Sequence, residues 1–357
     1  MEFPIPLDKS LSSETKRRVL IVRLGSMGDI LHSLPVLASL RESSPDWEVD
    51  WLVESRWRPL LEGNTNLSRV VDLDTLAWRR QPLWLPGCRA FAGVIQTLRE
   101  RSYDCALDLQ ASLKSAAACY LSGAAEILGF ESPWLKEPAC GVFYTRRVAA
   151  TGTVHVVEAN LALAAALGAK PGPIRFPLPP GDPASLPPDL PRNGLAVFNP
   201  GAGWRSKLWP AENYALVSDA LERELSLPVV LNCGPGEDGL AQQVVRACGH
   251  SRPRVYSGDV PGLIALLRRS RLMVGPDTGP VHLAAALGVP TVGLFGPTDP
   301  RRNGPYGPCH KSLRPDGAVT SHRRSAPAGI MEQIRPNQVL AAIHEVLGDR
   351  GGVGSRE

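Results

Sequence analysis

Segment 274–282 (VGPDTGPVH) combines residue types that could bind a phosphate. Asp277 and Thr278 have side chains that can cap a helix, Gly279 lets a ligand approach the backbone, and Pro280 suits a first helical position. A helix N-terminus offers unpaired backbone N–H groups and a positive dipole potential, and both attract an anion. An ordinary capped helix would use the same residues, so the rest of the chain must decide.

A second glycine-bearing loop, 199–210 (NPGAGWRSKLWP), adds a cation. Gly201 and Gly203, on either side of Ala202, permit close backbone approach, and Lys207 can reach a diphosphate. The Walker A pattern is absent from this loop, which excludes a P-loop site. The alternative is a solvated lysine in a surface turn.

Segment 232–238 (NCGPGED) ends in two carboxylates, Glu237 and Asp238. An acid at such a strand end can accept hydrogen bonds from the ribose hydroxyls of a nucleotide, although it can also simply favour a helix start. Together with the two glycine loops, this acid favours a nucleotide diphosphate as the ligand.

A carboxylate that could serve as a general base follows the first strand, in RLGSMGD (23–29). Asp29 stands there at a helix start, and the alternative is a residue that only begins the helix. His32 lies on the same helical face and could orient Asp29, although a packed histidine is the simpler interpretation. A dinucleotide fingerprint would need a glycine at Met27, which disfavours NAD even though Glu54 could act as its ribose acid.

Apolar strand-like runs alternate with helical patterns, which predicts buried parallel sheets. Strands are expected at 18–24, 49–54, 105–110, 195–199, 228–232, 254–258 and 272–275, and helices near 29–42, 112–122, 210–225, 237–248 and 336–348. We predict an α/β protein of two doubly wound domains, 17–170 and 194–348, joined by the proline-rich linker 171–193 and flanked by flexible tails at 1–16 and 349–357. Because ligands of such folds bind at the carboxyl ends of strands, all four loops should face one interdomain cleft.

Composition agrees with a globular protein that binds an anion. Hydrophobic residues make up 43% of the 357 residues and charged ones 21%, and the net charge is only +4, far from a nucleic-acid-binding signature. The seven cysteines form no C-x-x-C pair, so neither zinc nor a disulfide framework is expected. No signal peptide or apolar run long enough for a transmembrane segment is seen, although the chain could touch a membrane surface.

The chain resembles the family 9 glycosyltransferases, the ADP-heptose:lipopolysaccharide heptosyltransferases, over about 18–348. The heptosyltransferase I branch of that family is the most similar. The motifs that carry the resemblance are RVLIVRLGSMGDILHSLP, YDCALDLQASLKSA, KEPACGVFYTRR with HVVEAN, KLWPAENY, GPDTGPVHLAAAL, and FGPTDP followed by GPYG.

The resemblance implies a GT-B fold of two Rossmann-like domains and an inverting reaction without metal or other cofactor. The donor would be ADP-heptose and the acceptor the Kdo of Kdo-lipid A. The enzyme would be a monomer in the cytoplasm, peripheral to the inner membrane. The alternatives are a family member with another nucleotide sugar or glycan acceptor, and a nucleotide-sugar-binding protein without catalysis.

The resemblance also implies roles for individual positions of this chain. Asp29 matches the catalytic base and Lys207 the donor-phosphate lysine, which we also count as catalytic. The other donor-binding candidates are Gly201, Ala202, Gly203, Glu237 or Asp238, Asp277, Thr278, Gly279 and His282, and the acceptor-binding candidates are Gly28, His32, Arg79, Arg80 and Lys114.

Two departures from the family pattern affect the site. Ala202 and Gly203 stand where relatives carry Thr or other polar residues, so backbone contacts must replace hydroxyl contacts to the phosphate. The loop after Pro305 also differs from the tail expected for this branch, which leaves its part in the acceptor site open.

Overall fold

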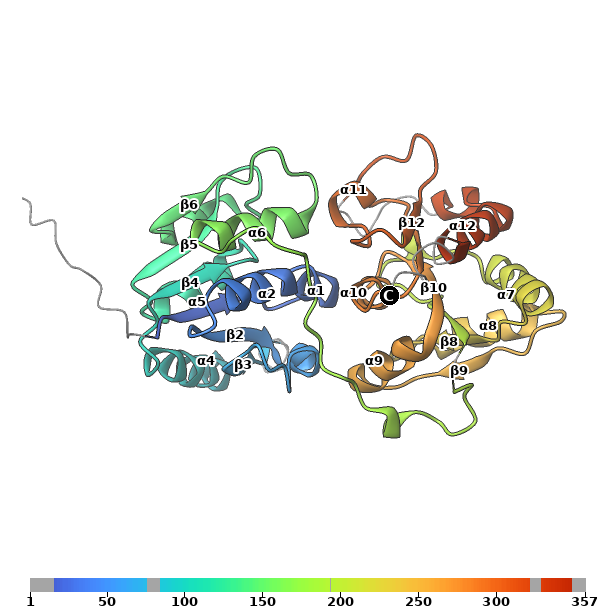
Figure 1. The fold of residues 1–357 in the computed structure, drawn as a ribbon, viewed down its shortest axis with the longest axis horizontal. Coiled ribbons are helices and arrows are strands. Elements are labelled where there is room, and N and C mark those ends of the chain that lie inside the picture. Colours follow the sequence, from blue (N-terminus) through green and yellow to red (C-terminus); the bar gives the residue numbers. More distant parts are fainter. Residues whose placement is uncertain (1–15, 76–83, 193, 322–328, 349–357) are drawn as a thin grey trace, which may run out of the picture.

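The computed structural model describes residues 16–75, 84–192, 194–321 and 329–348. Its strands form two six-stranded sheets in two lobes, and all the recorded strand pairs are parallel (Figure 1). The strand order is β3-β2-β1-β4-β5-β6 in the first sheet and β12-β11-β10-β7-β8-β9 in the second. Read from its other edge, the second order repeats the first, and both are the doubly wound order of Rossmann folds. The predicted fold class is confirmed.

The first lobe is built on a core strand that is apolar after its first residue, Arg18. In β1, Val19 to Val22 are buried, because helices cover both faces of a parallel sheet. The strands of this lobe are β1 (Arg18–Val22), β2 (Glu48–Glu54), β3 (Arg69–Leu73), β4 (Cys105–Asp108), β5 (Glu126–Phe130) and β6 (Arg146–Val148). Its helices are α1 (Met27–Leu31), α2 (Leu34–Ser43), α4 (Trp84–Arg99), α5 (Leu113–Leu121) and α6 (Val156–Ala166), with 3₁₀ helices η1 (Ser55–Leu60) and η2 (Pro138–Phe143).

The second lobe follows the same plan, with β7 and β10 paired at its centre. Its strands are β7 (Leu195–Phe198), β8 (Val229–Asn232), β9 (Arg254–Tyr256), β10 (Ser270–Pro276), β11 (Thr291–Leu294) and β12 (His310–Leu313). Its helices are α7 (Ala211–Leu225), α8 (Asp238–Ala247), α9 (Val260–Arg269), α10 (Gly279–Ala286), α11 (Pro300–Asn303) and α12 (Pro336–Gly348), with η4 (Arg205–Lys207) and η5 (Ile330–Gln333). The last helix, α12, packs against α7 and the second sheet through Val339, Ile343 and Val346.

The single helix predicted near 29–42 is two helices. The first, α1, ends at Leu31, and α2 begins at Leu34 with Pro35 in its first turn. Because proline has no N–H, it cannot donate to the carbonyl of Leu31, so the chain restarts the helix here. The break leaves α1 as a short helix whose N-terminal turn carries Asp29.

The proline-rich segment 171–192 contains only the 3₁₀ helix η3 (Pro183–Ser185) and is bonded to both lobes. Asn64 of the first lobe donates to the carbonyl of Pro177 at 2.8 Å, and Arg268 of α9 donates to the carbonyl of Pro179 at 3.0 Å. The N–H of Asp182 donates to the carbonyl of Pro261 at 2.9 Å. The segment is therefore fixed against both lobes along its length.

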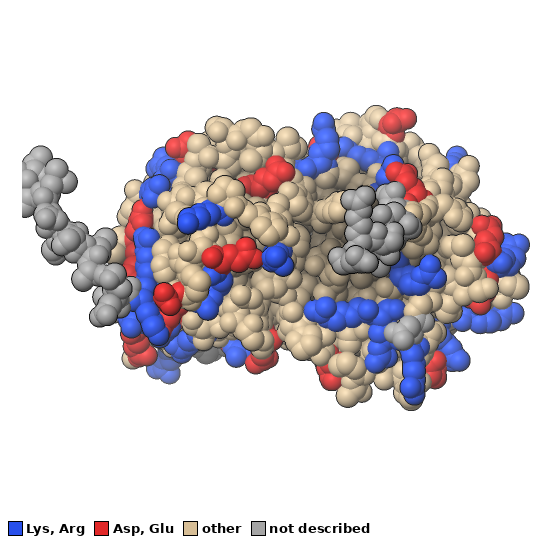
Figure 2. All heavy atoms as spheres, in the orientation of Figure 1, with Lys and Arg blue, Asp and Glu red and all other residues tan. Residues whose placement is uncertain are grey.

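The part of the chain that the structure describes has no helix with the length and apolarity needed to cross a bilayer. Six cysteines are unpaired, Cys105, Cys119, Cys140, Cys233, Cys248 and Cys309, and the first four of these are buried. Figure 2 shows Lys and Arg side chains interspersed with Asp and Glu over both lobes of the face it presents.

Candidate active site

A cavity of about 490 Å³ lies between the two lobes, in the size range of ligand sites. It opens where strand order reverses in each sheet, at the carboxyl ends of β1 and β4 and of β7 and β10. Doubly wound folds bind their ligands at this position. The first lobe contributes Ser26, Met27, Gly28 and Trp57. The second lobe contributes Asn199, 201–204, Lys207, 232–235, Glu237, 258–260, Leu263 and 277–280.

The N-termini of α1 and α10 meet across the cleft, and two glycines allow them to do so. A Cβ on Gly28 would lie 2.7 Å from Cδ2 of His282, and one on Gly279 would lie 2.4 Å from Sδ of Met27. Both distances are too short for real side chains, so glycine is needed at each position. The lobes thus touch at the points where each sheet presents its ligand-binding edge.

Lys207 is held by Asp277 at the wall of the cavity. Its Nζ lies 2.6 Å from Asp277 Oδ2 and 3.1 Å from the Asp277 carbonyl, and it stands 4.9 Å from the ring centre of Trp204. The other carboxylate oxygen of Asp277 accepts from Nε2 of His282 at 2.9 Å. Burial opposes ionisation of Asp277, but the bond from His282 and the charge of Lys207 outweigh it, so the pKa of this carboxyl lies well below its usual range. Asp277 therefore positions Lys207 and His282, which the sequence alone left undecided.

The first turn of α10 presents backbone N–H groups to the cavity. Thr278 occupies the N-cap position, yet its side chain makes no capping bond, because Oγ1 donates to the carbonyl of Pro276 at 3.0 Å. The expectation that this side chain caps the helix is wrong. Pro280 has no N–H, so the N–H groups of Thr278 and Gly279 are the donors that this turn can offer an anion.

Glu237 lies over the glycine loop of the second lobe, and Gly201 makes room for it. A Cβ on Gly201 would fall 2.0 Å from Oε2 of Glu237, whose carboxylate also accepts from the N–H of Gly234 at 2.9 Å. Asp238 is exposed and does not line the cavity. Of the two acids that the sequence offered, the geometry therefore favours Glu237 as the one that faces a ligand.

Two asparagines that the sequence analysis missed connect the loops of the second lobe. Asn199 donates to the carbonyl of Gly201 at 2.8 Å and accepts from Nδ2 of Asn232 at 2.6 Å. Each of them ends or directly follows a buried strand, β8 or β7, and a buried amide at such a place must find partners within the fold. A polar amide at the end of a buried apolar run is therefore the sequence signal that could have identified both asparagines.

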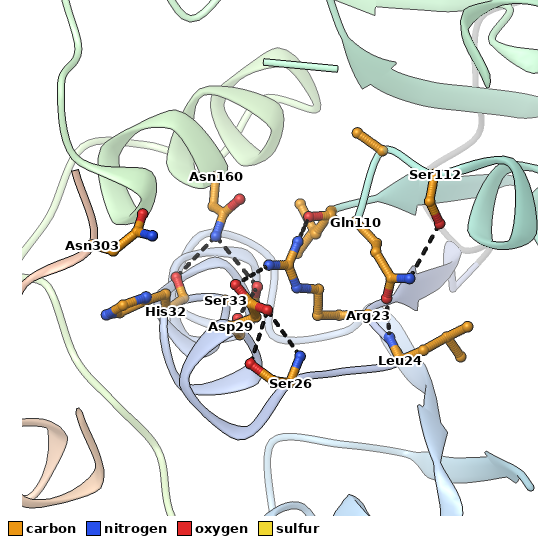
Figure 3. A network of polar contacts seen from close by, with 12 residues as sticks. Arg23, Leu24, Ser26, Asp29, His32, Ser33, Gln110, Ser112, Asn160 and Asn303 are labelled. Atoms are coloured by element: carbon orange, nitrogen blue, oxygen red, sulfur yellow. Dashed lines mark hydrogen bonds and ion pairs between the residues drawn. The ribbon is translucent and has the colours of Figure 1, made fainter. Parts of the chain in front are cut away.

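Asp29 is held by a buried arginine and by the loop before it, as Figure 3 shows. Nη2 of Arg23 lies 2.7 Å from Asp29 Oδ1, while Oδ2 accepts from the backbone N–H of Ser26 at 2.8 Å and from its hydroxyl at 3.0 Å. Partial burial opposes ionisation, but the charge of Arg23 and the bond from the Ser26 N–H hold the pKa of Asp29 below its usual value. Asp29 is thus an ionised carboxylate, and these three contacts fix its orientation.

His32 does not orient Asp29, and this interpretation is corrected. Its ring packs between His155 and His282, with ring centres 5.3 Å and 4.7 Å away, and Nε2 has no hydrogen-bond partner among the described residues. Burial and the two neighbouring histidines hold the pKa of His32 well below its usual value, so the ring is neutral. The packed interpretation is the correct one, and Arg23 at the carboxyl end of β1 performs the orienting role.

The remaining acceptor candidates are only partly brought to the site. Gly28 lines the cavity, whereas Lys114 is exposed at the start of α5. The loop before Lys114 is tied to the Asp29 loop, since Gln110 accepts from the N–H of Leu24 at 2.9 Å and donates to Ser112 at 3.1 Å (Figure 3). Arg79 and Arg80 lie outside the described residues. Ala202 and Gly203 line the cavity as the sequence predicts.

Comparison with known proteins identifies the family. A family model described as glycosyltransferase family 9 (heptosyltransferase) matches residues 91–326, which is more than half of the chain. The chain belongs to this glycosyltransferase family. The resemblance inferred from the motifs is confirmed, and with it the prediction that the chain is a glycosyltransferase.

Relatives of the family 9 enzyme are similar over most of their length. Lipopolysaccharide heptosyltransferase 1 of Pseudomonas aeruginosa is 30% identical over 301 residues, which cover 81% of each chain. The solved structure of E. coli heptosyltransferase WaaC with ADP superimposes with a TM-score of 0.76 at 28% identity, covering 92% of this chain and 99% of that one. The structure of WaaC with ADP-2-deoxy-2-fluoro heptose gives a TM-score of 0.75 at 26% identity. Both comparisons agree with the two-lobed fold described above.

Proposed function

We propose that this family 9 glycosyltransferase transfers L-glycero-D-manno-heptose from ADP-heptose to the Kdo of Kdo-lipid A, in the synthesis of the lipopolysaccharide inner core. The observation that carries the proposal is the cavity itself, which has a cation and a helix N-terminus on one lobe and, on the other, residues 26–28 directly before Asp29. The names of the relatives in Pseudomonas aeruginosa and E. coli, and the ADP and ADP-sugar analogue bound to WaaC, support the choice of donor and pathway.

The second lobe is suited to bind the donor. The N–H groups of Thr278 and Gly279 can donate to a phosphate, and Lys207 stands beside them. When the bond between the sugar and the diphosphate breaks, negative charge grows on the leaving phosphate oxygen, and these fixed donors stabilise it without reorganisation. In this proposal the donor phosphate replaces Asp277 as the partner of the Lys207 ammonium, and the Glu237 carboxylate accepts hydrogen bonds from the ribose hydroxyls.

The first lobe supplies the base. An acceptor hydroxyl that enters beside Gly28 loses its proton to the Asp29 carboxylate as its oxygen attacks the anomeric carbon. The new glycosidic bond forms on the face opposite the departing ADP, which inverts the configuration at that carbon. The proton remains on Asp29 and the electron pair of the broken bond leaves with ADP, so the step is balanced with protein groups alone.

The enzyme would act as a monomer at the cytoplasmic face of the inner membrane, where its lipid acceptor is found. No metal or other cofactor takes part in the proposed step, because Lys207 and the helix N-terminus stabilise the leaving diphosphate and Asp29 receives the proton.

Mass spectrometry of Kdo-lipid A after incubation with the purified protein tests the proposal. With ADP-heptose we expect the mass of one added heptose, and no addition with ADP-glucose or UDP-sugars. Addition from one of these other donors, or to another glycan, would replace the proposed substrates with those of a different family member. Binding of ADP-heptose without any product would favour a non-catalytic binding protein.

A further inference from the structure

Exposed apolar side chains gather on one small surface of the first lobe. Of the eight large apolar side chains that are exposed in the described residues, three lie on α5 and η2: Leu113 at 44%, Tyr120 at 59% and Val142 at 76% exposure. The other five lie on other segments of the chain: Val154, Ile174, Leu216 and Leu225 of α7, and Val319. Such a concentration on a surface is typical of an interaction site.

We define the α5–η2 patch as six apolar residues of these two packed elements: Leu113, Ala117, Tyr120, Pro138, Val142 and Phe143. Three of its members, Leu113, Ala117 and Tyr120, follow the spacing i, i+4, i+7, so they share one face of α5. The rings of Tyr120 and Phe143 lie 5.7 Å apart and join the helix to η2. At the other end of the helix, the N–H of Leu113 donates to Glu137 at 2.9 Å, directly before η2.

Exposed cations accompany the patch. Lys114 follows Leu113 on α5, and Lys136 precedes η2. Arg147 donates to the carbonyl of Gly141 at 3.0 Å, so its guanidinium lies against η2. Segments 112–121 and 136–147 contain one acid, Glu137, and its carboxylate already accepts from the N–H of Leu113. An apolar surface beside cations complements a bilayer that carries anionic headgroups.

The patch begins at the loop that supports the proposed base. Ser112, which caps α5, accepts from Gln110, and Gln110 accepts from the N–H of Leu24 beside Arg23. Leu113 is therefore one residue from a network that ends at Asp29 (Figure 3). A lipid-linked acceptor whose acyl chains stay in the bilayer would reach the base most directly if this surface met the membrane.

We propose that the α5–η2 patch docks the enzyme on an anionic phospholipid bilayer. Leu113, Tyr120 and Val142 enter the boundary between headgroups and acyl chains, while Lys114, Lys136 and Arg147 contact lipid phosphates. This proposal rests on the proposed function only in one respect: the lipid-linked acceptor is the reason for the enzyme to bind a membrane. The docking itself does not require the acceptor.

Vesicle binding tests the docking directly. The probes are vesicles of phosphatidylethanolamine with phosphatidylglycerol, and vesicles of phosphatidylcholine alone. We expect the full chain to sediment with the anionic vesicles, more weakly at raised salt, and hardly at all with phosphatidylcholine. The variant Tyr120→Ser/Val142→Ser should bind the anionic vesicles about tenfold more weakly, because it loses two inserting side chains.

A matched control replaces two exposed apolar residues of the second lobe, Leu216→Ser/Val319→Ser, and should bind like the wild-type chain. Equal binding by all three proteins overturns the proposal. Size-exclusion chromatography without lipid tests whether a second copy of the chain binds this surface instead. If the wild-type chain is a dimer and the patch variant is a monomer, the surface is an interface between copies and the proposal is wrong.

Turnover separates this proposal from the proposed function. On a soluble Kdo oligosaccharide without acyl chains, the patch variant should match the wild-type chain, whereas on Kdo-lipid A in vesicles it should be slower. If the wild-type chain glycosylates neither acceptor, the proposed function fails while the vesicle arm still decides the docking. Equal loss on both acceptors would show that the patch supports the fold rather than the membrane contact.

Discussion

The guanidinium of Arg23 lies 2.7 Å from the carboxylate of Asp29, directly after strand β1, whose residues 19–22 belong to the core of the first lobe. Only 9% of the Arg23 side chain is exposed, and it also donates to the carbonyl of Leu109. The protonation of the proposed base is thus governed from the centre of the sheet. Because Arg23 joins β1 to the loop after β4, it also fixes the two strand ends that border the cleft.

Replacing Arg23 should change the pH dependence of the reaction. Arg23 lowers the pKa of Asp29, so Arg23→Met should raise it. Since the base works only when ionised, the acidic limb of the kcat/KM profile should move to higher pH. The matched variant Arg23→Lys keeps a cation and should keep the limb closer to that of the wild-type chain. An unmoved limb in a folded Arg23→Met variant would show that Asp29 does not set it.

Removing the carboxylate of Asp29 should separate chemistry from donor binding. We expect Asp29→Asn to lower kcat about 10²–10⁴-fold, the usual contribution of a general base. ADP affinity, measured by calorimetry, should stay nearly unchanged because Asp29 acts on the acceptor. Substantial turnover by this variant would remove Asp29 as the base.

Lys207 should affect binding and catalysis together. Lys207→Ala removes the cation beside the first turn of α10 and should weaken ADP binding about tenfold or more, while also lowering kcat. The variant Lys207→Arg retains the charge but not the compact ammonium, so we expect it to recover only part of the affinity. If both parameters survive the loss of Lys207, the phosphate assignment is wrong.

The Asp277 carboxylate should stabilise the fold in a pH-dependent manner. Its pKa is lower in the folded protein than its ordinary value of 3.8, so its contribution is complete above that value and is lost as the pH falls through the lower folded pKa. The difference in the free energy of unfolding between the wild-type chain and Asp277→Asn should therefore be largest near neutral pH and shrink in acid. Urea unfolding across this range measures it, and a constant difference would contradict the assignment.

The contact between the lobes should depend on its two glycines. Gly28→Ala places a Cβ 2.7 Å from the ring of His282, so the lobes must separate or shift. We expect kcat/KM to fall about tenfold and small-angle X-ray scattering to report a larger radius of gyration. Gly239→Ala, where a Cβ would meet nothing within 4 Å, is the control and should leave both unchanged.

The sequence predicts the central strands and the site loops because a buried strand is visible in the sequence as a run of apolar residues. Strand β7 is apolar throughout and β1 is apolar after Arg18, and the loops that follow these strands line the cleft. The edge strands β6 (RRV) and β12 (HKSL) have no such pattern, because they are short and largely polar. They depend on pairing with the neighbouring strand.

Contacts between distant segments are the part that the sequence does not reveal. The spacing of Asp29 and His32 correctly places them on neighbouring turns, but only the fold brings His155 and His282 against the ring of His32. The pairing of Asn199 with Asn232, and of Lys207 with Asp277, likewise joins positions 33 and 70 residues apart.

The anchored segment 171–192 has a consequence for the entropy of catalysis. A free linker of this length would let the lobes sample many relative orientations, and donor binding would have to suppress them. Here the prolines already restrict the backbone, and the bonds at Pro177, Pro179 and Asp182 hold it to both lobes before any substrate arrives. Folding alone therefore removes much of the disorder that cleft closure would otherwise have to remove, so more of the donor's binding free energy is left for the reacting bond.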